Sequence, residues 1–284
     1  MRQIKADRRG VGKLNGSRPD ESQRRLSFSL QDGLHDHFRA MRRLVGRSPP
    51  NIHINAVRSW PRGQGDDVYR LNLTAGDRAE LGRLAQVIEF KTAGSLIFAQ
   101  GEDAGFLYLL ADGLVRTCHT LHNGERQVLA FHWPGDLFGL AEKAKYTTAA
   151  ETIISSKVYR FPIQTLEQFI SSRPTILDGL LVKAVHDLRA SQRQIIVMGR
   201  YDIPERVAAF LLDCSAHEAY FDAAQNVLDL PMSRYDIADY LGTSAETVTR
   251  AMARLERDGM LRRLAPRKLE LRLDRLRQRI GLVD

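Results

Sequence analysis

The chain has 284 residues, 43% of them hydrophobic and 27% charged, and its net charge is +8 at pH 7. This composition provides enough apolar side chains for packed cores and excludes a wholly disordered chain. The longest unbroken apolar runs have six residues, which excludes the stretch of ~20 that a transmembrane helix needs.

Residues 1–70 carry 15 Lys and Arg against 7 Asp and Glu, and the last 35 residues carry 11 against 5. The positive blocks attract phosphates. Residues 1–70 lack a clear period apart from a helix expected around residues 26–45, so we expect a basic, mostly disordered extension without an assigned role. The first 16 residues are basic but lack the apolar core of a signal peptide, which predicts a cytoplasmic protein without a membrane partner.

Residues 71–172 change from a helical to a strand pattern. Residues 74–88 are expected to form a short helix, with Thr74 and Asp77 as the capping pair at its start. From residue 93 to 161, short apolar runs alternate with turn signals such as Asn123 followed by Gly124, which favours a β-hairpin. Short strands with glycine corners are typical of an antiparallel barrel or jelly roll, here termed the roll.

Residues 173–200 have the pattern of a long helix, with Pro174 at its start. Apolar residues recur in steps of four and three, interrupted by one serine, as in the seam of a coiled coil. This seam consists of Leu177, Leu181, Ala184, Leu188, Ser191, Ile195 and Met198.

Further apolar residues lie off the seam: Leu180, Val182, Val185 and Ile196. A helix that is apolar on more than one side needs more than one partner. We therefore expect one face to pack on the roll and the seam to pack on a second copy in a parallel homodimer; the alternative is a helix packed only on its own roll.

Residues 201–284 contain the spacing of a helix-turn-helix. Ser233 with Asp236 forms a predicted capping pair for the first helix, Gly242 is placed to end it, and Thr243 with Glu246 is the predicted capping pair of the second. The inward positions are apolar: Ile237, Ala238, Leu241, Val248, Met252 and Leu255. Any two-helix hairpin in a core would explain these apolar positions.

That simpler explanation does not account for the outward positions of the second helix. Glu246, Thr249, Arg250 and Arg254 lie at i, i+3, i+4 and i+8, and their side chains suit contacts with base edges and phosphates. The following segment predicts a β-hairpin with a turn at residues 265–268, which would form a wing beside the second helix.

A glycine-punctuated roll, a long seam helix and a winged helix-turn-helix, in this order, resemble the Crp/Fnr family of bacterial transcription regulators over about residues 74–284. The run Met-Ser-Arg-Tyr-Asp-Ile-Ala-Asp-Tyr-Leu-Gly at residues 232–242, followed by Glu-Thr-Val-Thr-Arg at 246–250, is most similar to the Fnr/FixK branch. The resemblance implies an α+β fold. It consists of an antiparallel β-roll like a cyclic-nucleotide-binding jelly roll (71–172), a dimerisation helix (173–200) and a winged helix-turn-helix domain (201–284).

The resemblance also implies how DNA is recognised. In Fnr-like members a Glu-x-x-Ser-Arg set reads the half-site TTGAT; here it is Glu246, Thr249 and Arg250, with Thr in place of Ser. Ala245 stands where Crp-like members carry an arginine, so the implied site is of the type TTGAT-N4-ATCAA. The expected contacts to the DNA backbone are Ser233, Arg234, Thr243, Ser244, Thr247, Arg254, Arg267 and Lys268.

The function implied is that of a homodimeric, sequence-specific transcriptional regulator rather than an enzyme. It would activate genes of low-oxygen or nitrogen-oxide metabolism and bind double-stranded DNA, its own second copy and RNA polymerase. Target genes, the signal and the choice between activation and repression do not follow from the sequence.

No cofactor is predicted. Leu140 stands where cyclic-nucleotide-binding members carry the ribose-binding Glu, and Tyr146 where they carry the phosphate-binding Arg. We therefore do not expect cAMP to bind, because its phosphate would lose water without gaining a fixed cation. Fnr-type oxygen sensing needs a cysteine cluster, and residues 1–75 contain no cysteine, so an iron–sulfur cluster of that type is excluded. Cys118 and Cys214 are expected to be small buried apolar residues, with a redox role left open.

Two alternatives remain. The first is a sensor-regulator gated by a small molecule, such as haem, nitric oxide or an unknown ligand. The second is a cupin-like metal enzyme on the roll that uses Glu125 with His119, His122 and His132. His119 and His122 are three residues apart, so on a strand they would point to opposite faces, and we expect them to be surface histidines near a hairpin tip.

Overall fold

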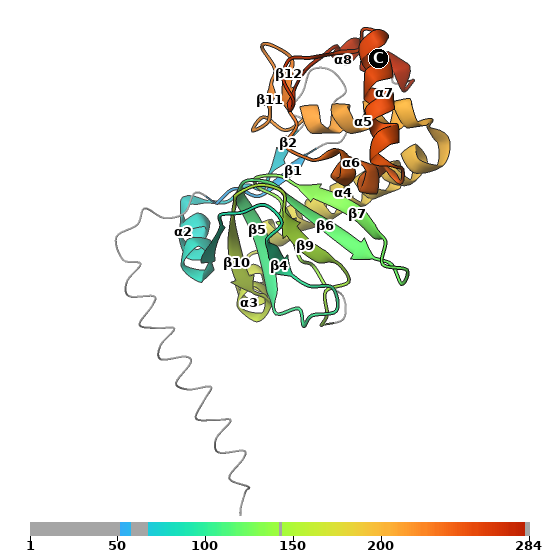
Figure 1. Ribbon diagram of the computed structural model, residues 1–284. Helices are drawn as coiled ribbons and strands as arrows, with labels where there is room; N and C mark the ends of the chain where they lie inside the picture. The colour runs from blue at the N-terminus through green and yellow to red at the C-terminus, as the bar shows by residue number, and fades with distance from the viewer. Residues whose placement is uncertain (1–51, 58–67, 142–143, 282–284) are drawn as a thin grey trace, which may run out of the picture. The chain divides into compact units, whose positions relative to one another are not determined.

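The computed structural model describes residues 52–57, 68–141 and 144–281. The helix expected around residues 26–45 lies outside these ranges. Figure 1 shows the helices and strands of the described part. None of the described helices is long and apolar enough to cross a membrane.

The roll consists of two antiparallel sheets, as the turn pattern predicted (Figure 1). The first has the strand order β3 (Gln86–Phe90), β10 (Ser156–Pro162), β5 (Phe106–Asp112) and β8 (Leu137–Phe138). The second has the order β4 (Leu96–Phe98), β9 (Ala149–Thr152), β6 (Val115–Thr120) and β7 (Arg126–His132). The predicted hairpin joins β6 to β7, and Gly124 in its turn has the positive φ of 84° that a glycine tolerates best.

Helix α2 (Ala75–Leu84) is shorter than the sequence suggested. Its predicted cap is confirmed, since Thr74 and Asp77 form a capping box. The expected extension to residue 88 is wrong, because Gln86–Phe90 forms strand β3 and Ile88 pairs with Val158 of β10. Pairing with a strand 70 residues away outweighs the weak helical period at this end.

Two short strands lie within residues 1–70, the segment expected to be mostly disordered. Strands β1 (Asn55–Val57) and β2 (Val68–Arg70) pair with each other. Ile52 and Ile54 are buried in a core cluster that includes Phe169 of helix α3 (Ile163–Ser171). Burial of these two side chains removes apolar surface from water and attaches this part of the chain to the roll.

The interior of the roll is filled by aromatic side chains. Tyr146 is 3% exposed, and its ring stacks on Phe98 with 3.9 Å between centroids. Tyr108 and Phe138 stack beside this pair at 5.4 Å. The Tyr146 hydroxyl donates to the carbonyl of Phe106 at 2.8 Å, which satisfies its polar end. Aromatic groups therefore occupy the space between the two sheets.

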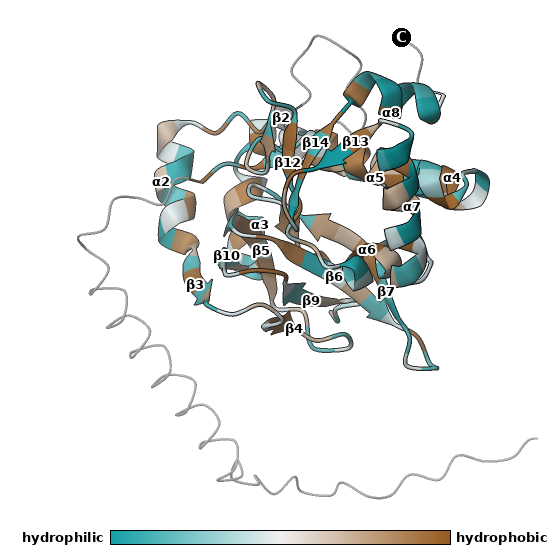
Figure 2. Ribbon diagram, turned by 45° about the horizontal axis from the view of Figure 1, so that its top comes forward, coloured by the Kyte–Doolittle hydropathy of each residue, from teal (hydrophilic) through white to brown (hydrophobic). Residues whose placement is uncertain are grey.

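Helix α4 (Pro174–Arg200) buries one face and exposes another. Ile176, Lys183 and Val197 are buried along it. The predicted seam is exposed apart from Met198, which is half-buried. Leu180 is half-buried and packs against a core cluster of the roll, as expected. Val182, Val185 and Ile196 are exposed, so the expectation that they pack on the roll is wrong. In Figure 2, this helix carries both hydrophilic and hydrophobic residues along its length. The exposed apolar stripe is thus wider than a strict seam.

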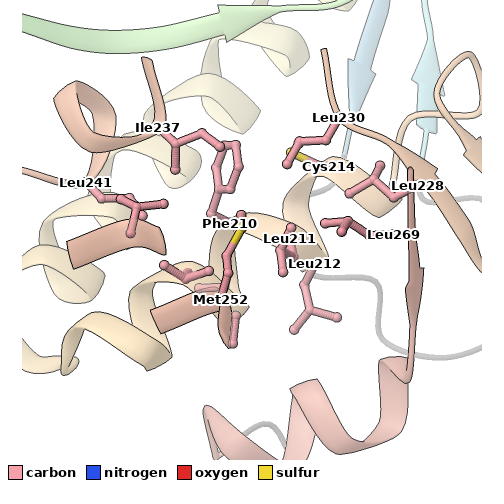
Figure 3. Close-up of a cluster of buried hydrophobic side chains, with 14 of the residues drawn as sticks. Phe210, Leu211, Leu212, Cys214, Leu228, Leu230, Ile237, Leu241, Met252 and Leu269 are labelled. Atoms are coloured by element: carbon pink, nitrogen blue, oxygen red, sulfur yellow. The ribbon is translucent and has the colours of Figure 1, made fainter. Parts of the chain in front are cut away.

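The C-terminal part packs three helices and a small sheet around helix α5 (Ile203–Ser215). These elements are α6 (Arg234–Leu241), α7 (Ala245–Arg257) and α8 (Leu273–Arg279), with the sheet order β11 (Phe221–Asp222), β12 (Val227–Asp229), β14 (Lys268–Leu271) and β13 (Leu261–Arg263). Consecutive residues 207–212 of α5 are all buried, so this helix is covered on every side. Figure 3 shows Phe210, Leu211 and Leu212 among side chains from α6, α7 and the sheet.

The roll and the C-terminal part share this hydrophobic core. Leu114, Trp133 and Ile153 of the roll belong to the same buried cluster as Phe210 and its neighbours. The hydroxyl of Tyr220 also donates to the Gly113 carbonyl at 2.8 Å. The C-terminal helices are therefore packed directly on the roll as well as linked to it through α4.

Candidate nucleic-acid interface

Helix α6 begins and ends at the predicted residues. The Ser233 hydroxyl accepts from the backbone N–H of Asp236 at 3.1 Å, and the Asp236 carboxylate accepts from the backbone N–H of Ser233 at 3.0 Å. These bonds confirm the predicted capping box. Gly242 follows the helix with φ 62° and ψ 48°, the left-handed conformation that ends many helices.

Helix α7 begins one residue later than predicted. The N-cap is Ser244, whose hydroxyl accepts from the backbone N–H of Thr247 at 3.2 Å. The predicted cap by Thr243 with Glu246 is therefore wrong. A cap needs an extended backbone with its side chain aimed at the first turn, and Ser244 has this conformation at φ −92° and ψ 155°.

The inward and outward faces of these two helices are as predicted. All six inward positions are buried: Ile237, Ala238, Leu241, Val248, Met252 and Leu255. Glu246, Thr249 and Arg250 are exposed on α7. In Figure 2, α7 carries both hydrophilic and hydrophobic segments, as expected for a helix with one face in a core. The helix-turn-helix thus presents an acid, a hydroxyl-bearing residue and a guanidinium on one free surface.

The local hydrogen bonds define the state of these three side chains. Glu246 has its pKa lowered, because its own backbone N–H and the Ser244 hydroxyl donate to its carboxylate. The Thr249 hydroxyl donates to the Ala245 carbonyl at 2.8 Å, which leaves its methyl group as the free part. Arg250 donates one N–H to the Thr247 hydroxyl at 3.0 Å and keeps its other donors available.

The residues expected to contact the DNA backbone differ in how exposed they are. Ser233, Ser244, Arg254, Arg267 and Lys268 are exposed, whereas Arg234, Thr243 and Thr247 are half-buried. The Ser233 hydroxyl is engaged in the capping box. Arg254 lies 3.9 Å from Asp258, a weak pairing at the surface.

The wing is the hairpin of β13 and β14. Leu261 pairs with Leu271 and Arg263 with Leu269. Arg267 and Lys268 lie exposed at its turn, as expected. The Arg267 carbonyl accepts from the Leu230 backbone N–H at 2.7 Å, which connects the turn to the end of β12.

A network of charged side chains joins α6 to the β6–β7 hairpin, and the sequence analysis did not predict it. Arg116 pairs with Asp236, and its Nε donates to Glu151 at 3.1 Å. Arg126 donates to the Asp239 carboxylate at 2.7 Å. The partners in the two pairs that reach α6, Arg116 with Asp236 and Arg126 with Asp239, are more than 100 residues apart in the chain, so no local pattern could have indicated them.

The histidines of the roll do not form a metal site. His122 is exposed at the hairpin tip, as expected, whereas the ring of His119 bonds to the Thr147 carbonyl at 3.0 Å. His132 bonds to the Thr117 hydroxyl at 3.1 Å. Within the described ranges, no three His, Cys, Asp or Glu side chains come close enough to hold a metal ion.

Both cysteines are buried, as expected. Burial raises the pKa of each thiol. A raised thiol pKa disfavours the reactive thiolate.

Comparison with known proteins gives the same organisation. Residues 205–279 match the family model of a Crp-like helix-turn-helix domain. Residues 89–173 match the model of a cyclic nucleotide-binding domain.

Relatives that match about two thirds of this chain extend this result. The transcriptional activatory protein AadR of Rhodopseudomonas palustris is 34% identical over 66% of this chain and 79% of its own length. The nitrogen fixation regulation protein FixK of Bradyrhizobium diazoefficiens is 32% identical over 67% of this chain and 80% of its own. The solved structure of FixK2 from Bradyrhizobium japonicum matches with a TM-score of 0.63 and 34% identity, covering 68% of this chain and 96% of that one.

The chain belongs to the Crp/Fnr family of DNA-binding transcriptional regulators. The resemblance to the Fnr/FixK branch, expected from residues 232–250, is confirmed by these relatives.

Proposed function

We propose that the protein is a homodimer that reads a palindrome of the type TTGAT-N4-ATCAA and activates transcription from it. The observation that carries this proposal is the free surface formed by Glu246, Thr249 and Arg250 on a helix whose other face is buried. Its relatives AadR and FixK are named as a transcriptional activatory protein and a nitrogen fixation regulation protein. This supports a role in low-oxygen or nitrogen metabolism.

Each of the three side chains suits one partner in the half-site. The guanidinium of Arg250 can donate two hydrogen bonds to the O6 and N7 atoms of guanine. The lowered pKa of Glu246 keeps its carboxylate ionised, so that it accepts from a cytosine amine. The free methyl group of Thr249 can contact the methyl group of thymine.

The surrounding residues would position the helix on the duplex. Arg254 on α7 and the wing residues Arg267 and Lys268 are exposed cations suited to phosphates. The N-terminus of α7, with Thr243, Ser244 and Thr247, would donate to a neighbouring phosphate. At the start of α6, Arg234 would donate to a phosphate, whereas the Ser233 hydroxyl already donates to Asp236 at 2.7 Å.

The seam of α4 supports the homodimer. Leu181, Leu188 and Ile195 expose 64%, 58% and 72% of their surface in the single chain. They lie on one helix face in heptad spacing, which a parallel partner helix would cover. A two-fold dimer would also match the two-fold symmetry of a palindromic DNA site.

The roll does not supply the groups that hold a cyclic nucleotide. Leu140, at the position of the ribose-binding Glu, is 75% exposed. Tyr146, at the position of the phosphate-binding Arg, lies in the aromatic interior. We therefore propose a regulator that does not depend on cAMP. In keeping with the family, we propose that it acts in the cytoplasm together with RNA polymerase.

The test is selection of bound DNA from a random pool, with and without cAMP. We expect enrichment of TTGAT-N4-ATCAA in both conditions. Arg250→Ala should weaken binding to the selected site by about 1–3 kcal/mol and relax the preference for guanine at one position. Arg83→Ala, an exposed arginine on α2, serves as the control that should leave binding unchanged. No enriched sequence, or full specificity in Arg250→Ala, would contradict the proposal.

A further inference from the structure

A cavity of about 290 Å³ lies where the roll, helix α4 and helix α5 meet. Strand β7 contributes Phe131, and Trp133 follows directly after this strand. Helix α4 contributes Arg193, α5 contributes Asp213, and α6 contributes Tyr240. Figure 1 shows where these elements run. The cavity is separate from the aromatic interior of the roll, since Phe98 and Tyr146 do not line it. Its volume is near the lower end of the range of small-molecule sites, about 300–1,000 Å³.

The charged groups of the cavity leave one carboxylate in excess. Its lining contains three carboxyl groups, Asp136, Asp187 and Asp213, against two cations, Lys183 and Arg193. Lys183 donates to Asp187 at 2.9 Å. Asp136 accepts from the backbone N–H of Trp133 at 2.9 Å. Asp213 lies beside Arg193, but its Oδ1 accepts no hydrogen bond from any described residue.

Asp213 has a buried oxygen that lacks a hydrogen-bond donor. Among the described residues, its Oδ1 has no hydrogen-bond partner, and the nearest cationic atom is Nη2 of Arg193 at 3.6 Å. A buried carboxylate oxygen without a hydrogen-bond donor is costly, because it has lost water without replacement. Burial raises its pKa to about 6, which reflects the same cost. A ligand that donates an N–H group to Oδ1 of Asp213 would remove this energetic cost.

An aromatic wall faces the cavity. Phe131 lies 5.9 Å from Phe210 and 5.2 Å from Tyr240, measured between ring centroids. The ring of His217 stacks on Trp133 at 4.2 Å, and burial lowers the pKa of this histidine to about 3, so it is neutral and does not repel a cation. Aromatic faces attract organic cations through their quadrupoles. A carboxylate that lines the same cavity as these rings is complementary to a planar cationic group.

We propose that this cavity is a binding site for a small organic cation with N–H donors, of the amine, amidine or guanidine class, held by Asp213 and the aromatic wall of Phe131, Phe210 and Tyr240. The cavity is lined by the roll, by helix α4 and by helix α5 of the C-terminal part, so a bound ligand would contact all three. An effect on DNA binding, which rests on the proposed function, follows from this position.

The test uses benzamidine, a planar amidine, as the probe and the fluorescence of Trp133 as the readout. The chain has two tryptophans, so Trp60→Phe leaves Trp133 as the reporter. We expect a saturable change with benzamidine, weaker binding of the neutral analogue benzamide, and none of the anion benzoate. Asp213→Asn should weaken benzamidine binding at least ten-fold, whereas Asp229→Asn, an exposed aspartate outside this cavity, should not.

A second variant tests the proposal independently, in case Asp213→Asn does not fold. Ala190→Leu fills the cavity from α4 and leaves Asp213 in place, and it should also abolish the fluorescence response. The fluorescence response of the Trp60→Phe protein is measured without DNA. The result therefore does not depend on whether the protein binds TTGAT-N4-ATCAA. Absence of saturable binding, equal affinity in Asp213→Asn, or benzoate binding as tight as benzamidine would overturn the proposal.

Discussion

Gly242 illustrates how a single residue shapes the helix-turn-helix. It ends α6 with φ 62°, and a Cβ placed there would lie 2.6 Å from Cε of Met198 on α4. The left-handed conformation is costly for residues with a Cβ. The same residue therefore allows both the sharp turn before α7 and the close approach of α4.

We expect Gly242→Ala to lower the free energy of unfolding by about 1–2 kcal/mol, the cost of the left-handed conformation, because the flexible Met198 side chain can move away. The matched control is Gly199→Ala in α4, where nothing lies within 4 Å of an added Cβ and φ is not positive. Alanine in a helix is more stable than glycine by about 0.5–1 kcal/mol, so the control should be neutral or stabilising. Urea unfolding measures both, and equal effects would contradict this explanation.

Asp213 gives a prediction for the pH dependence of stability. Burial raises its pKa from 3.8 to about 6. A carboxyl whose pKa is higher in the folded than in the unfolded state contributes most stability at low pH, and this contribution is lost as pH rises through about 6. Asp213→Asn removes the ionisation, so the variant should be more stable than the unchanged protein at pH 7, by the order of 1–2 kcal/mol.

The advantage of the variant should shrink as pH falls from 7 to 4.5, because the unchanged carboxyl then binds a proton in the folded state. Denaturant unfolding at both pH values measures the difference, and comparison with the variant removes the contribution of Asp136, whose pKa burial also raises to about 6. A difference that grows toward pH 4.5 would show that the Asp213 carboxylate is stabilised rather than penalised.

At the scale of elements, the position of α6 depends on the β6–β7 hairpin. Arg116 and Arg126 extend from the hairpin to Asp236 and Asp239 on the helix. The side chain of Asp236 is 6% exposed and that of Arg116 12%, so this pair is largely shielded from water. Asp236 also belongs to the capping box of α6. One carboxylate thus serves both the start of the helix and its attachment to the roll.

The outer pair of this network can be tested by exchanging its two charges. Arg126 also lies 3.5 Å from Asp236, so the exchange can restore only part of the lost stability. Asp239→Arg should destabilise the protein, because it places a second guanidinium against Arg126. Arg126→Asp in addition should restore part of the loss, with a coupling energy of about 1 kcal/mol, since both side chains are about 30% exposed and partly screened. Thermal unfolding of the two single variants and the double variant gives this energy. A coupling near zero would show that the pair does not hold α6 on the roll.

At the scale of the whole molecule, helix α4 leaves an apolar stripe in water in the single chain. Leu177, Leu181, Leu188 and Ile195 are each more than half exposed. Covering them in a dimer would remove apolar area from water at roughly 25 cal/mol per Å².

Leu181→Glu combined with Leu188→Glu should therefore prevent formation of the proposed dimer, because four carboxylates would face each other in the seam. Sedimentation equilibrium measures the mass. The affinity for the full palindrome should fall together with the dimer, whereas Gln168→Glu, an exposed position on α3, should change neither. A dimer that survives the double substitution would place the interface elsewhere.

The sequence by itself determined the features that depend on near neighbours. The capping box of Ser233 and Asp236, the left-handed Gly242 and the buried positions of α6 and α7 follow from side chains within a few residues of one another. The same locality explains the β6–β7 hairpin at Asn123 and Gly124. Such interactions leave a pattern along the chain because their geometry is fixed by helical and strand periods.

Tertiary structure alone decided which distant groups meet. Strand pairing turned residues 86–90 from the end of a helix into β3. Arg126 and Asp239 meet across 113 residues, and Asp213 lines the same cavity as Phe131 of the roll. Contacts of this kind depend on how whole elements pack, and packing is set by the combined burial of many side chains, so no single spacing in the sequence records them.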